Sequence, residues 1–574
     1  MIFEITDDNR PYLETRGRIV LNACPGSGKT SAIAFKLTAL SKECLETYGA
    51  YAGIACLSFT NVAKDEIAHK FEKISGGRLA YPHITSTLDS FINQYITLPY
   101  YYLFNKSTKR PTVMNNVGFL DDMSLGWFQS KRGKMPVKFF YPPSKLKIEM
   151  DGTFTWNGYL PDPANVDTKI FENYAKKFKD WQHENGYLNN DDSTYYALKL
   201  LETYPEIATS LVRRFPYIIV DEAQDTSEIQ YKIIDILIAA GLANVELVGD
   251  PYQSLYEFRE AEPAMFLARF NDAKNWQQTR FNFCRRSSQR IVDAYSVFRN
   301  AKEDAITAVG SHATDHNLKV LRYDSANLPN LLERYETLVD PKNDNYILVR
   351  GAKHLEMFGV KTSSENPWKN RLARLLIESQ ISFQNGNSKL GVDLVREFLA
   401  EINTAGADYR AKNDEVKRLK EDTDLNISLF EFLNGMPSID ASLTDWTTTT
   451  TAYIKTAFGK DVDLQLKQKG KVYNSQIVRE LLYPPMTLPY PVSTIHKVKG
   501  MTFSSVLVVL SEDSKGGNFS LKNFSKPADL PDEKQRMLYV ALSRPETLAC
   551  IAVPNVFTED QIRSHLGIDL EFIA

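Results

Sequence analysis

The sequence predicts an α/β protein with two parallel-sheet cores, each interrupted by an insertion. Short apolar runs typical of buried strands alternate with helical segments over residues 18–91 and 215–250, and again over 318–350 and 492–553. Between the two parts of the first core the chain becomes rich in Tyr, Lys and Asn, and between the two parts of the second it becomes helical and polar. We therefore expect two α/β domains, each carrying an inserted subdomain.

The bulk composition excludes several classes of protein. The net charge of −3 gives no overall cationic surface, so a nucleic-acid site is expected to be a local channel. The five cysteines have no CxxC spacing, which argues against a zinc ribbon or a disulfide framework and for a reducing compartment. No apolar run approaches 18 residues and the first residues lack a secretory signal pattern, so we expect a cytoplasmic protein with no membrane partner.

A phosphate-binding loop is predicted between the first strand, Arg18–Leu21, and the helix that follows Thr30. Gly26 and Gly28 let the backbone turn its N–H groups towards an anion, and the helix N-terminus adds positive dipole. Lys29 would reach the β- and γ-phosphates, and the Thr30 hydroxyl would bind Mg²⁺. The residues expected to contact the nucleotide are Ala23, Cys24, Pro25, Gly26, Ser27, Gly28, Lys29, Thr30 and Ser31.

Two later strands of the first core end in polar residues suited to NTP hydrolysis. Asp221 and Glu222 follow the apolar run 215–220, where Asp221 would hold the metal and Glu222 would orient or deprotonate the attacking water. Gln253 follows the strand 245–248 and can sense the γ-phosphate. Tyr256, Phe258 and Arg259 come directly after it, either as base-stacking groups or, for the two aromatic residues, as a core pair.

The second core supplies cations. Arg285, Arg286 and Arg544 could neutralise the charge on a leaving γ-phosphate across a cleft, or could form surface ion pairs. His496 and Lys499 follow the strand 492–495, at a strand tip that would face the cleft or a nucleic acid.

The first insertion, residues 97–200, has a hairpin pattern centred on Asp151-Gly152. Its basic clusters, which include Lys106, Lys109, Lys131 and Arg132, suit either a solvated surface or a nucleic-acid contact.

The order of these motifs resembles that of the superfamily 1 helicases of the UvrD/Rep/PcrA type. The matching segments are ACPGSGKT (23–30), SFTNVAKDEIAHK (58–70), TLDSF (87–91), DEAQD (221–225), VGDPYQSLYEFREA (248–261), NFCRRSS (282–288), STIHKVKGMTF (493–503) and EKQRMLYVALSR (533–544). The chain is also similar to the UvrD-like helicase subunits of Gabija-type antiphage systems, which act beside an OLD-family nuclease.

The resemblance implies two RecA-like P-loop domains, 1A (1–96 and 201–277) and 2A (278–384 and 487–574), with insertions 1B (97–200) and a reduced 2B (385–486). It also implies an ATP- and Mg²⁺-dependent enzyme that moves 3′ to 5′ on single-stranded DNA and unwinds tailed duplexes. Arg286 and Arg544 would be arginine fingers, and Lys29, Asp221, Glu222 and Gln253 the other catalytic residues. The implied DNA contacts are Phe59, Thr60, Asn61, Thr87, Tyr256, Phe258, Arg259, His496 and Lys499.

Four departures from the family pattern concern the base and sugar of a bound nucleotide or nucleic acid. Asn9 stands where the family has its adenine-reading glutamine, and Arg285 where a tyrosine stacks on adenine. Thr502 replaces a ribose-contacting glutamate, and Phe258 replaces a tryptophan. We therefore expect intact phosphate chemistry with relaxed base selectivity.

Two other functions remain to be weighed against a helicase. The first is a nucleotide- and DNA-sensing ATPase that regulates a partner nuclease without unwinding. The second is a P-loop phosphotransferase, which would leave the motifs after residue 248 without a role.

Overall fold

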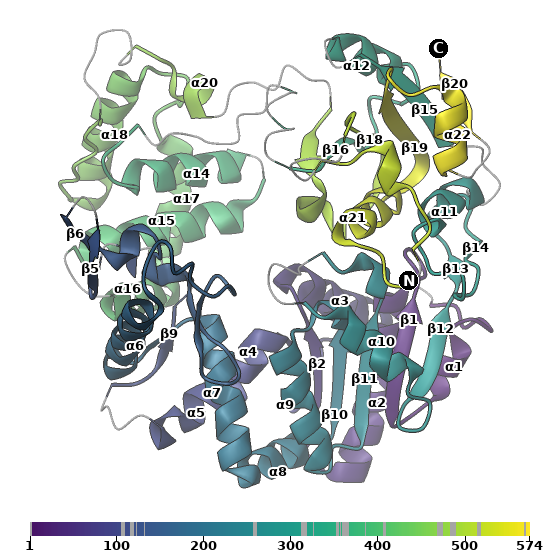
Figure 1. The fold of residues 1–574 in the computed structure, drawn as a ribbon. Coiled ribbons are helices and arrows are strands. Elements are labelled where there is room, and N and C mark those ends of the chain that lie inside the picture. The colour runs from purple at the N-terminus through teal and green to yellow at the C-terminus, as the bar shows by residue number, and fades with distance from the viewer. Residues whose placement is uncertain are drawn as a thin grey trace. The chain divides into compact units, whose positions relative to one another are not determined.

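A computed structural model gives the fold (Figure 1). It describes residues 3–104, 109–114, 120–121, 123–130, 133–255, 261–311, 318–324, 327–351, 355, 358, 367–384, 386–405, 409–467, 475–482, 490–513, 518–527, 529–566 and 570–573. Two compact units are present, one of residues 1–350 and 493–574 and the other of residues 351–492. No helix in the described ranges is long and apolar enough to cross a membrane.

The first sheet of the larger unit has the strand order β12-β1-β11-β10-β2-β3 in the described residues, and all its neighbouring strands are parallel. Its strands are β1 (Arg18–Ala23), β2 (Ile54–Ser58), β3 (Ile84–Thr87), β10 (Tyr217–Asp221), β11 (Asn244–Gly249) and β12 (Gln277–Phe281). The predicted α/β class is therefore confirmed. The sheet also takes in β12, so it continues past the expected end of domain 1A at residue 277.

Helices cover both faces of this sheet, which explains the unbroken apolar runs of its central strands. Ile19 and Leu21 pack in a core with α2 and α3, whereas Val20, between them, packs in the opposite core with α7 to α10. These helices are α2 (Lys29–Tyr48), α3 (Asn61–Ser75), α7 (Asn190–Thr203), α8 (Pro205–Arg214), α9 (Glu228–Ala239) and α10 (Pro263–Asn271), with the short α1 (Arg10–Glu14) and α4 (Leu88–Ile92) nearby. Helix α7 contributes Leu198 and Leu201 to this core although residue 200 was the expected end of the insertion.

The second sheet has the order β17-β16-β18-β19-β15-β20. Its strands are β15 (Leu318–Tyr323), β16 (Asn345–Val349), β17 (Val492–Thr494), β18 (Phe503–Val509), β19 (Pro545–Pro554) and β20 (Glu571–Ile573). Around it lie α11 (Gln289–Ser296), α12 (Leu328–Glu336), α21 (Glu533–Leu542) and α22 (Glu559–Leu566), and β13 (Phe283–Cys284) pairs with β14 (Thr307–Ala308) beside it. The core of this sheet also includes Cys24 and Tyr252 from the first α/β region.

The segment between β3 and α7 contains small paired strands and one long helix, α6 (Thr168–Asn185). The hairpin predicted around Asp151-Gly152 is present: β7 (Leu146–Ile148) pairs antiparallel with β8 (Phe154–Trp156), and Gly152 has a φ of 87° in the turn. Strands β5 (Trp127–Ser130) and β6 (Gly133–Pro136) also pair antiparallel, and β4 (Thr112–Val113) pairs with β9 (Tyr187–Leu188). Lys106, Lys131 and Arg132 lie outside the described residues.

The smaller unit is helical. Its helices are α14 (Leu372–Gln384), α15 (Ser388–Asn403), α16 (Tyr409–Glu421), α17 (Thr423–Gly435), α18 (Leu443–Phe458) and α20 (Val478–Leu482). Trp368 and Trp446 are fully buried in its core, with ring centroids 5.3 Å apart. The unit starts at residue 351 and not at the expected 385, because α14 buries Leu376 and Ile377 against the other helices of this unit.

Candidate functional site

The phosphate-binding loop connects β1 to α2, as the sequence predicts. Gly28 caps α2 with a φ of 88°, and Gly26 has a φ of 72°, both in the left-handed region that favours glycine. A Cβ atom on Gly26 would lie 2.6 Å from the Cβ of Arg286, so only glycine allows the second α/β domain to approach this closely. The Arg285 backbone N–H donates to the Gly26 carbonyl at 2.9 Å. The loop is thus packed directly against the segment that carries two of the predicted arginines.

The two acidic residues at the end of β10 lie beside the loop lysine: Asp221 is the last residue of the strand, and Glu222 follows it directly. Lys29 Nζ is 2.7 Å from Glu222 Oε1, and Asp221 Oδ1 accepts the Glu222 backbone N–H at 3.0 Å. Burial alone would raise the pKa of Glu222, but Lys29 and Lys499 outweigh it and hold the pKa at about 2. Burial raises the pKa of Asp221 to about 7 despite the attraction of Lys29. Burial also acts to lower the pKa of Lys29, but Glu222 and Asp221 leave it above its ordinary value.

Glu222 has a φ of 55°, which is unusual for a residue with a side chain. Such a conformation costs about 1–3 kcal/mol and persists only where the surrounding structure enforces it. Here it directs the carboxylate to Lys29 and to Gln224, whose Nε2 donates to Glu222 Oε2 at 2.6 Å. The strain is located at a residue predicted to act on the attacking water.

Gln253 connects the first sheet to an arginine of the second α/β domain. Its Nε2 donates to Asp250 Oδ2 at 2.8 Å, and its Oε1 accepts from Arg544 Nη2 at 2.9 Å. Arg544 is only 2% exposed, and burial followed by the nearby Arg286 lowers its pKa to about 9. Arg286 Nη1 in turn donates to the Ser543 carbonyl at 2.9 Å. The structure therefore brings Gln253, Arg286 and Arg544 together.

The predicted base end of the site contains Asn9 and Arg285. Both functions of the Asn9 amide are engaged within its own turn: Oδ1 accepts the Thr6 N–H at 2.9 Å, and Nδ2 donates to the Glu4 carbonyl at 3.0 Å. Arg285 lies at this end of the loop, donating to the Ser27 carbonyl at 2.8 Å and to Thr6 Oγ1 at 3.2 Å. To read a base, the Asn9 amide would have to give up internal hydrogen bonds.

Asp8 also lies at this end of the loop, close to Arg285, and the sequence did not indicate it. Its Oδ1 accepts the Asn282 N–H at 2.9 Å, and its Oδ2 is buried without a hydrogen-bond partner in the described structure. Burial raises the pKa of Asp8, and the neighbouring Arg285 opposes this shift. In a parallel sheet, strand ends and loops meet at one edge, but this rule does not distinguish Asp8 from its neighbours in the sequence.

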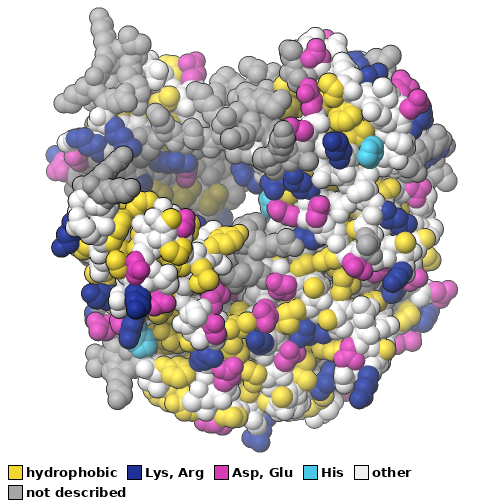
Figure 2. Space-filling view, viewed as in Figure 1, with side chains coloured by type: hydrophobic (Ala, Val, Ile, Leu, Met, Phe, Trp, Pro, Cys, Tyr) yellow, Lys and Arg dark blue, Asp and Glu magenta, His cyan; other side chains and the backbone are white. Residues whose placement is uncertain are grey.

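The predicted DNA contacts lie at several places. Thr60 and Thr87 each cap a helix that follows a strand of the first sheet, accepting from the Ala63 N–H at 3.2 Å and the Ser90 N–H at 3.1 Å. Phe59 and Asn61 flank Thr60 at the end of β2. Tyr256, Phe258 and Arg259 lie outside the described residues. The described side chains on the face in Figure 2 mix both signs of charge, so a uniformly cationic surface is not seen there.

His496 and Lys499 follow β17, close to the first α/β domain. Lys499 forms an ion pair with Asp225, and both side chains are less than 10% exposed. Burial raises the pKa of Asp225 to about 6, although Lys499 acts to lower it. Burial, followed by the nearby Arg350, lowers the pKa of His496. Lys499, predicted to contact DNA, thus joins the two α/β domains, and its partner Asp225 was not predicted.

The donor set suits a magnesium ion that also binds phosphate. Among the described residues no three His, Cys, Asp or Glu side chains are grouped as metal ligands. Thr30 in the first turn of α2 and the buried Asp221 instead offer one hydroxyl and one carboxylate. Mg²⁺ is commonly held by one or two carboxylates together with substrate phosphates. The Ser27 hydroxyl, buried in the loop without a hydrogen-bond partner in the described structure, is a further polar group that an anion could satisfy.

Comparison with known proteins shows which sequences this chain resembles. Residues 6–274 match the UvrD/REP helicase N-terminal domain. The chain is 26% identical over 296 residues to a probable DNA helicase II homolog of Mycoplasma capricolum, covering 49% of this chain and 38% of that protein. It is 24% identical over 398 residues to the ATP-dependent DNA helicase srs2 of Schizosaccharomyces pombe, covering 64% and 41%. A third relative, an ATP-dependent helicase/nuclease subunit of Exiguobacterium sibiricum, is 29% identical over 205 residues, covering 33% and 17%. The chain thus spans less than half the length of these relatives.

Proposed function

We propose that this chain, a member of the UvrD/REP helicase family, is an ATP-driven DNA helicase or translocase that moves 3′ to 5′ on single-stranded DNA. The observation that carries the proposal is the site itself. A phosphate-binding loop and acidic strand end from one α/β domain meet Arg286 and Arg544 from the other, and Gln253 contacts Arg544 at 2.9 Å. A hydrolytic site assembled from two domains can convert nucleotide turnover into relative domain movement.

In the proposed reaction Lys29 exchanges its partner. Its ammonium group now pairs with Glu222, and the phosphate oxygens of ATP would replace that carboxylate. Glu222, released from Lys29, would then orient the attacking water and accept its proton. Magnesium bound by Thr30 and Asp221 would neutralise charge on the phosphates. Arg286 and Arg544 would stabilise the charge that develops as the γ-phosphate leaves.

Coupling to DNA would pass through contacts between the two α/β domains. Tyr539 OH donates to Asp250 Oδ2 at 3.0 Å, and the same carboxylate oxygen accepts from Gln253. A change at the γ-phosphate that moves Gln253 would therefore reach α21. The Lys499–Asp225 pair is a second contact between the two domains, at the segment after β17. We propose that DNA lies across Phe59, Thr60, Asn61 and Thr87 of the first domain and His496 of the second, with Tyr256, Phe258 and Arg259 as further contacts.

A strand-displacement assay tests the proposed activity. We expect single-stranded DNA to stimulate ATP hydrolysis, and a duplex with a 3′ tail to be unwound while a 5′-tailed duplex is not. Lys29→Ala, which removes the phosphate-binding ammonium, should be inactive in both assays and serves as the negative control. Displacement of only the 5′-tailed duplex would contradict the proposed direction.

A second candidate is a DNA-sensing ATPase that regulates a partner nuclease, in antiphage defence or DNA repair. The observation that favours it is the similarity to ATP-dependent helicase/nuclease subunits, whose names combine both activities. An OLD-family nuclease would be such a partner, because the sequence resembles the helicase subunits of Gabija-type systems, which act beside a nuclease of that family. DNA-stimulated hydrolysis without displacement of either tailed duplex would support this candidate over the helicase.

We also propose that base selectivity is relaxed. A site built to hydrogen-bond one substrate group rejects analogues that lack it by roughly 10⁴–10⁵, but the Asn9 amide is engaged with Thr6 and Glu4. We expect kcat/KM for GTP to lie within about tenfold of that for ATP, because Arg285 can stack on either base. Steady-state hydrolysis of ATP, GTP and CTP in saturating DNA measures the ratios, and rejection of both alternatives by more than about 10³ would disprove relaxed selectivity.

A further inference from the structure

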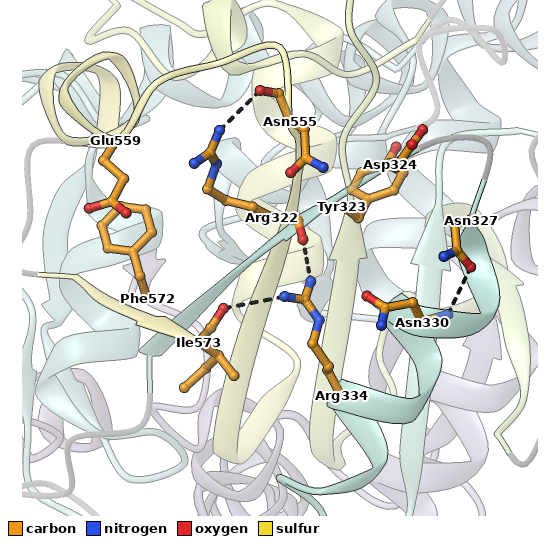
Figure 3. Close-up of a pocket in the computed structure, with 10 residues that line it drawn as sticks. All are labelled: Arg322, Tyr323, Asp324, Asn327, Asn330, Arg334, Asn555, Glu559, Phe572 and Ile573. Carbon is orange, nitrogen blue, oxygen red and sulfur yellow. Dashed lines mark hydrogen bonds between the residues drawn. The ribbon is translucent and has the colours of Figure 1, made fainter.

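A cavity lies at the carboxyl ends of β15, β19 and β20, with a volume of about 570 Å³ (Figure 3). Arg322, Tyr323, Arg334, Phe572 and Ile573 form its inner wall, and exposed polar residues surround its mouth. The carboxyl ends of parallel strands are where open α/β sheets bind ligands. A volume of this size is in the range of small-molecule sites.

This cavity is separate from the proposed ATP site. Strand β19 connects the two regions: Arg544 immediately precedes it, and Asn555, which lines the cavity, immediately follows it. The strand has 10 residues, so its ends are roughly 30 Å apart. A ligand in the cavity could not contact the phosphate-binding loop.

Two arginines project into the cavity without carboxylate partners. Arg322 Nη2 donates to the backbone carbonyls of Asn555 and Phe557, both at 3.0 Å. Arg334 donates to the carbonyls of Arg322 and Ile573. The Nε atoms of both arginines are buried without hydrogen-bond partners, and neither side chain forms an ion pair, within the described part of the chain. Two positive charges are therefore held in place by neutral carbonyls.

The arrangement favours an anionic group. Guanidinium groups bind phosphate in a bidentate manner, and these two half-buried cations have no ion-pair partner among the described residues. Helix α12, whose N-cap is Asn327, also begins at the cavity, and Asn330 of its first turn lines the mouth. The helix N-terminus adds to the positive potential.

Two carboxylates restrict what the anion can be. Asp324 and Glu559 lie on either side of Arg322 at the exposed mouth (Figure 3). They would repel a polyanion such as DNA, but they can accept hydrogen bonds from hydroxyl or amino groups of a smaller ligand. Phe572 adds an aromatic wall, braced by Arg563 with its guanidinium carbon 4.7 Å from the ring centroid.

We propose that this cavity binds the phosphate group of a small molecule the size of a nucleoside monophosphate, with Arg322 and Arg334 as its phosphate ligands. The proposal goes beyond the ATPase function and does not depend on it.

Isothermal titration of the full-length Lys29→Ala variant with AMP, inorganic phosphate and adenosine tests the site. We expect AMP and phosphate to bind and adenosine to bind much more weakly. Arg322→Glu should weaken AMP binding at least about tenfold, because hydrogen bonds to a charged group are lost. Asn330→Trp, on the exposed first turn of α12, should obstruct the cavity without disturbing the core. Lys319→Ala, which breaks an ion pair with Glu571 outside the cavity lining, should bind AMP normally.

The outcomes separate the possible sources of the phosphate. Tighter binding of AMP than of phosphate identifies a nucleotide as the ligand, and equal binding identifies phosphate alone. In both cases the same two arginines bind the phosphate. No binding of AMP or phosphate at millimolar concentration would overturn the proposal. Unchanged AMP binding in folded Arg322→Glu and Asn330→Trp, or displacement of AMP by single-stranded DNA, would overturn it too.

Discussion

Replacing Arg544 by alanine is expected to lower kcat for DNA-stimulated ATP hydrolysis by about 10³–10⁵, the range over which an arginine finger contributes to phosphoryl transfer. The side chain is 2% exposed, and its guanidinium reaches Gln253 across the boundary between the two α/β domains. Its pKa of about 9 reflects burial and the nearby Arg286, with no carboxylate bound directly to it in the described structure. A γ-phosphate is the group that would relieve this excess positive charge.

Arg286 should not compensate for the loss of Arg544. Its Nη1 is committed to the Ser543 carbonyl and its Cβ lies against Gly26 of the loop, so its position is set by other contacts than that of Arg544. We expect Arg544→Lys to recover only a small part of kcat, because an ammonium group lacks the planar fork of donors. The affinity for ATP should change less than kcat, since the charge that Arg544 stabilises develops mainly in the transition state.

Single-turnover hydrolysis, with nucleotide binding measured separately, checks this result. Arg269→Ala is the matched control: its side chain is also largely buried and forms an ion pair with Asp235, but it lies on α10 outside the site. Loss of activity in Arg269→Ala equal to that in Arg544→Ala would show a general effect of removing a buried arginine. A kcat for Arg544→Ala within tenfold of the parent would rule out the finger role.

Much of the fold was predictable because its signals are local. In β1 every residue after Arg18 is buried, and Ile19 and Val20 face opposite cores, so both faces of the strand must be apolar. The phosphate-binding loop is also a local signal, because Gly26 and Gly28 adopt the positive φ angles that its turn requires. Polar residues at the carboxyl ends of such strands, as at Asp221 and Glu222, were therefore expected at one edge of the sheet.

The remaining features depend on contacts between distant segments, which leave no periodic signal. Lys499 and Asp225 are 274 positions apart, and nothing in either local sequence indicates that they pair. Asp8 could be recognised only once the loop after β12 had placed the Asn282 N–H beside it. The start of the helical unit at residue 351 was missed for a similar reason, because the apolar face of α14 does not reveal which unit it packs in.

Replacing Lys36 by alanine is expected to lower the free energy of unfolding by about 3–5 kcal/mol, because it leaves a buried carboxylate without its counter-charge. Lys36 Nζ lies 2.7 Å from Glu246 Oε1, with both side chains at most 2% exposed. Tyr12 OH donates to the other oxygen of Glu246 at 2.7 Å, and Lys36 Nζ sits 4.1 Å from the centre of the Tyr12 ring. Urea unfolding followed by circular dichroism measures the change. Lys42→Ala, an exposed substitution on the same helix, should stay within about 0.5 kcal/mol of the parent.

The double variant Lys36→Met with Glu246→Gln separates the cost of an unpaired charge from the loss of packing. Methionine keeps most of the apolar stem, and glutamine keeps an acceptor for Tyr12, so no charge is left buried and most of the lost stability should return. If the double variant is as unstable as Lys36→Ala, packing around α2 and not charge explains the loss.

Lys36 lies seven residues after Lys29 on α2, on nearly the same face of the helix. Loosening this anchor should therefore also displace the phosphate-binding loop, and we expect Lys36→Ala to raise KM for ATP while the double variant restores it.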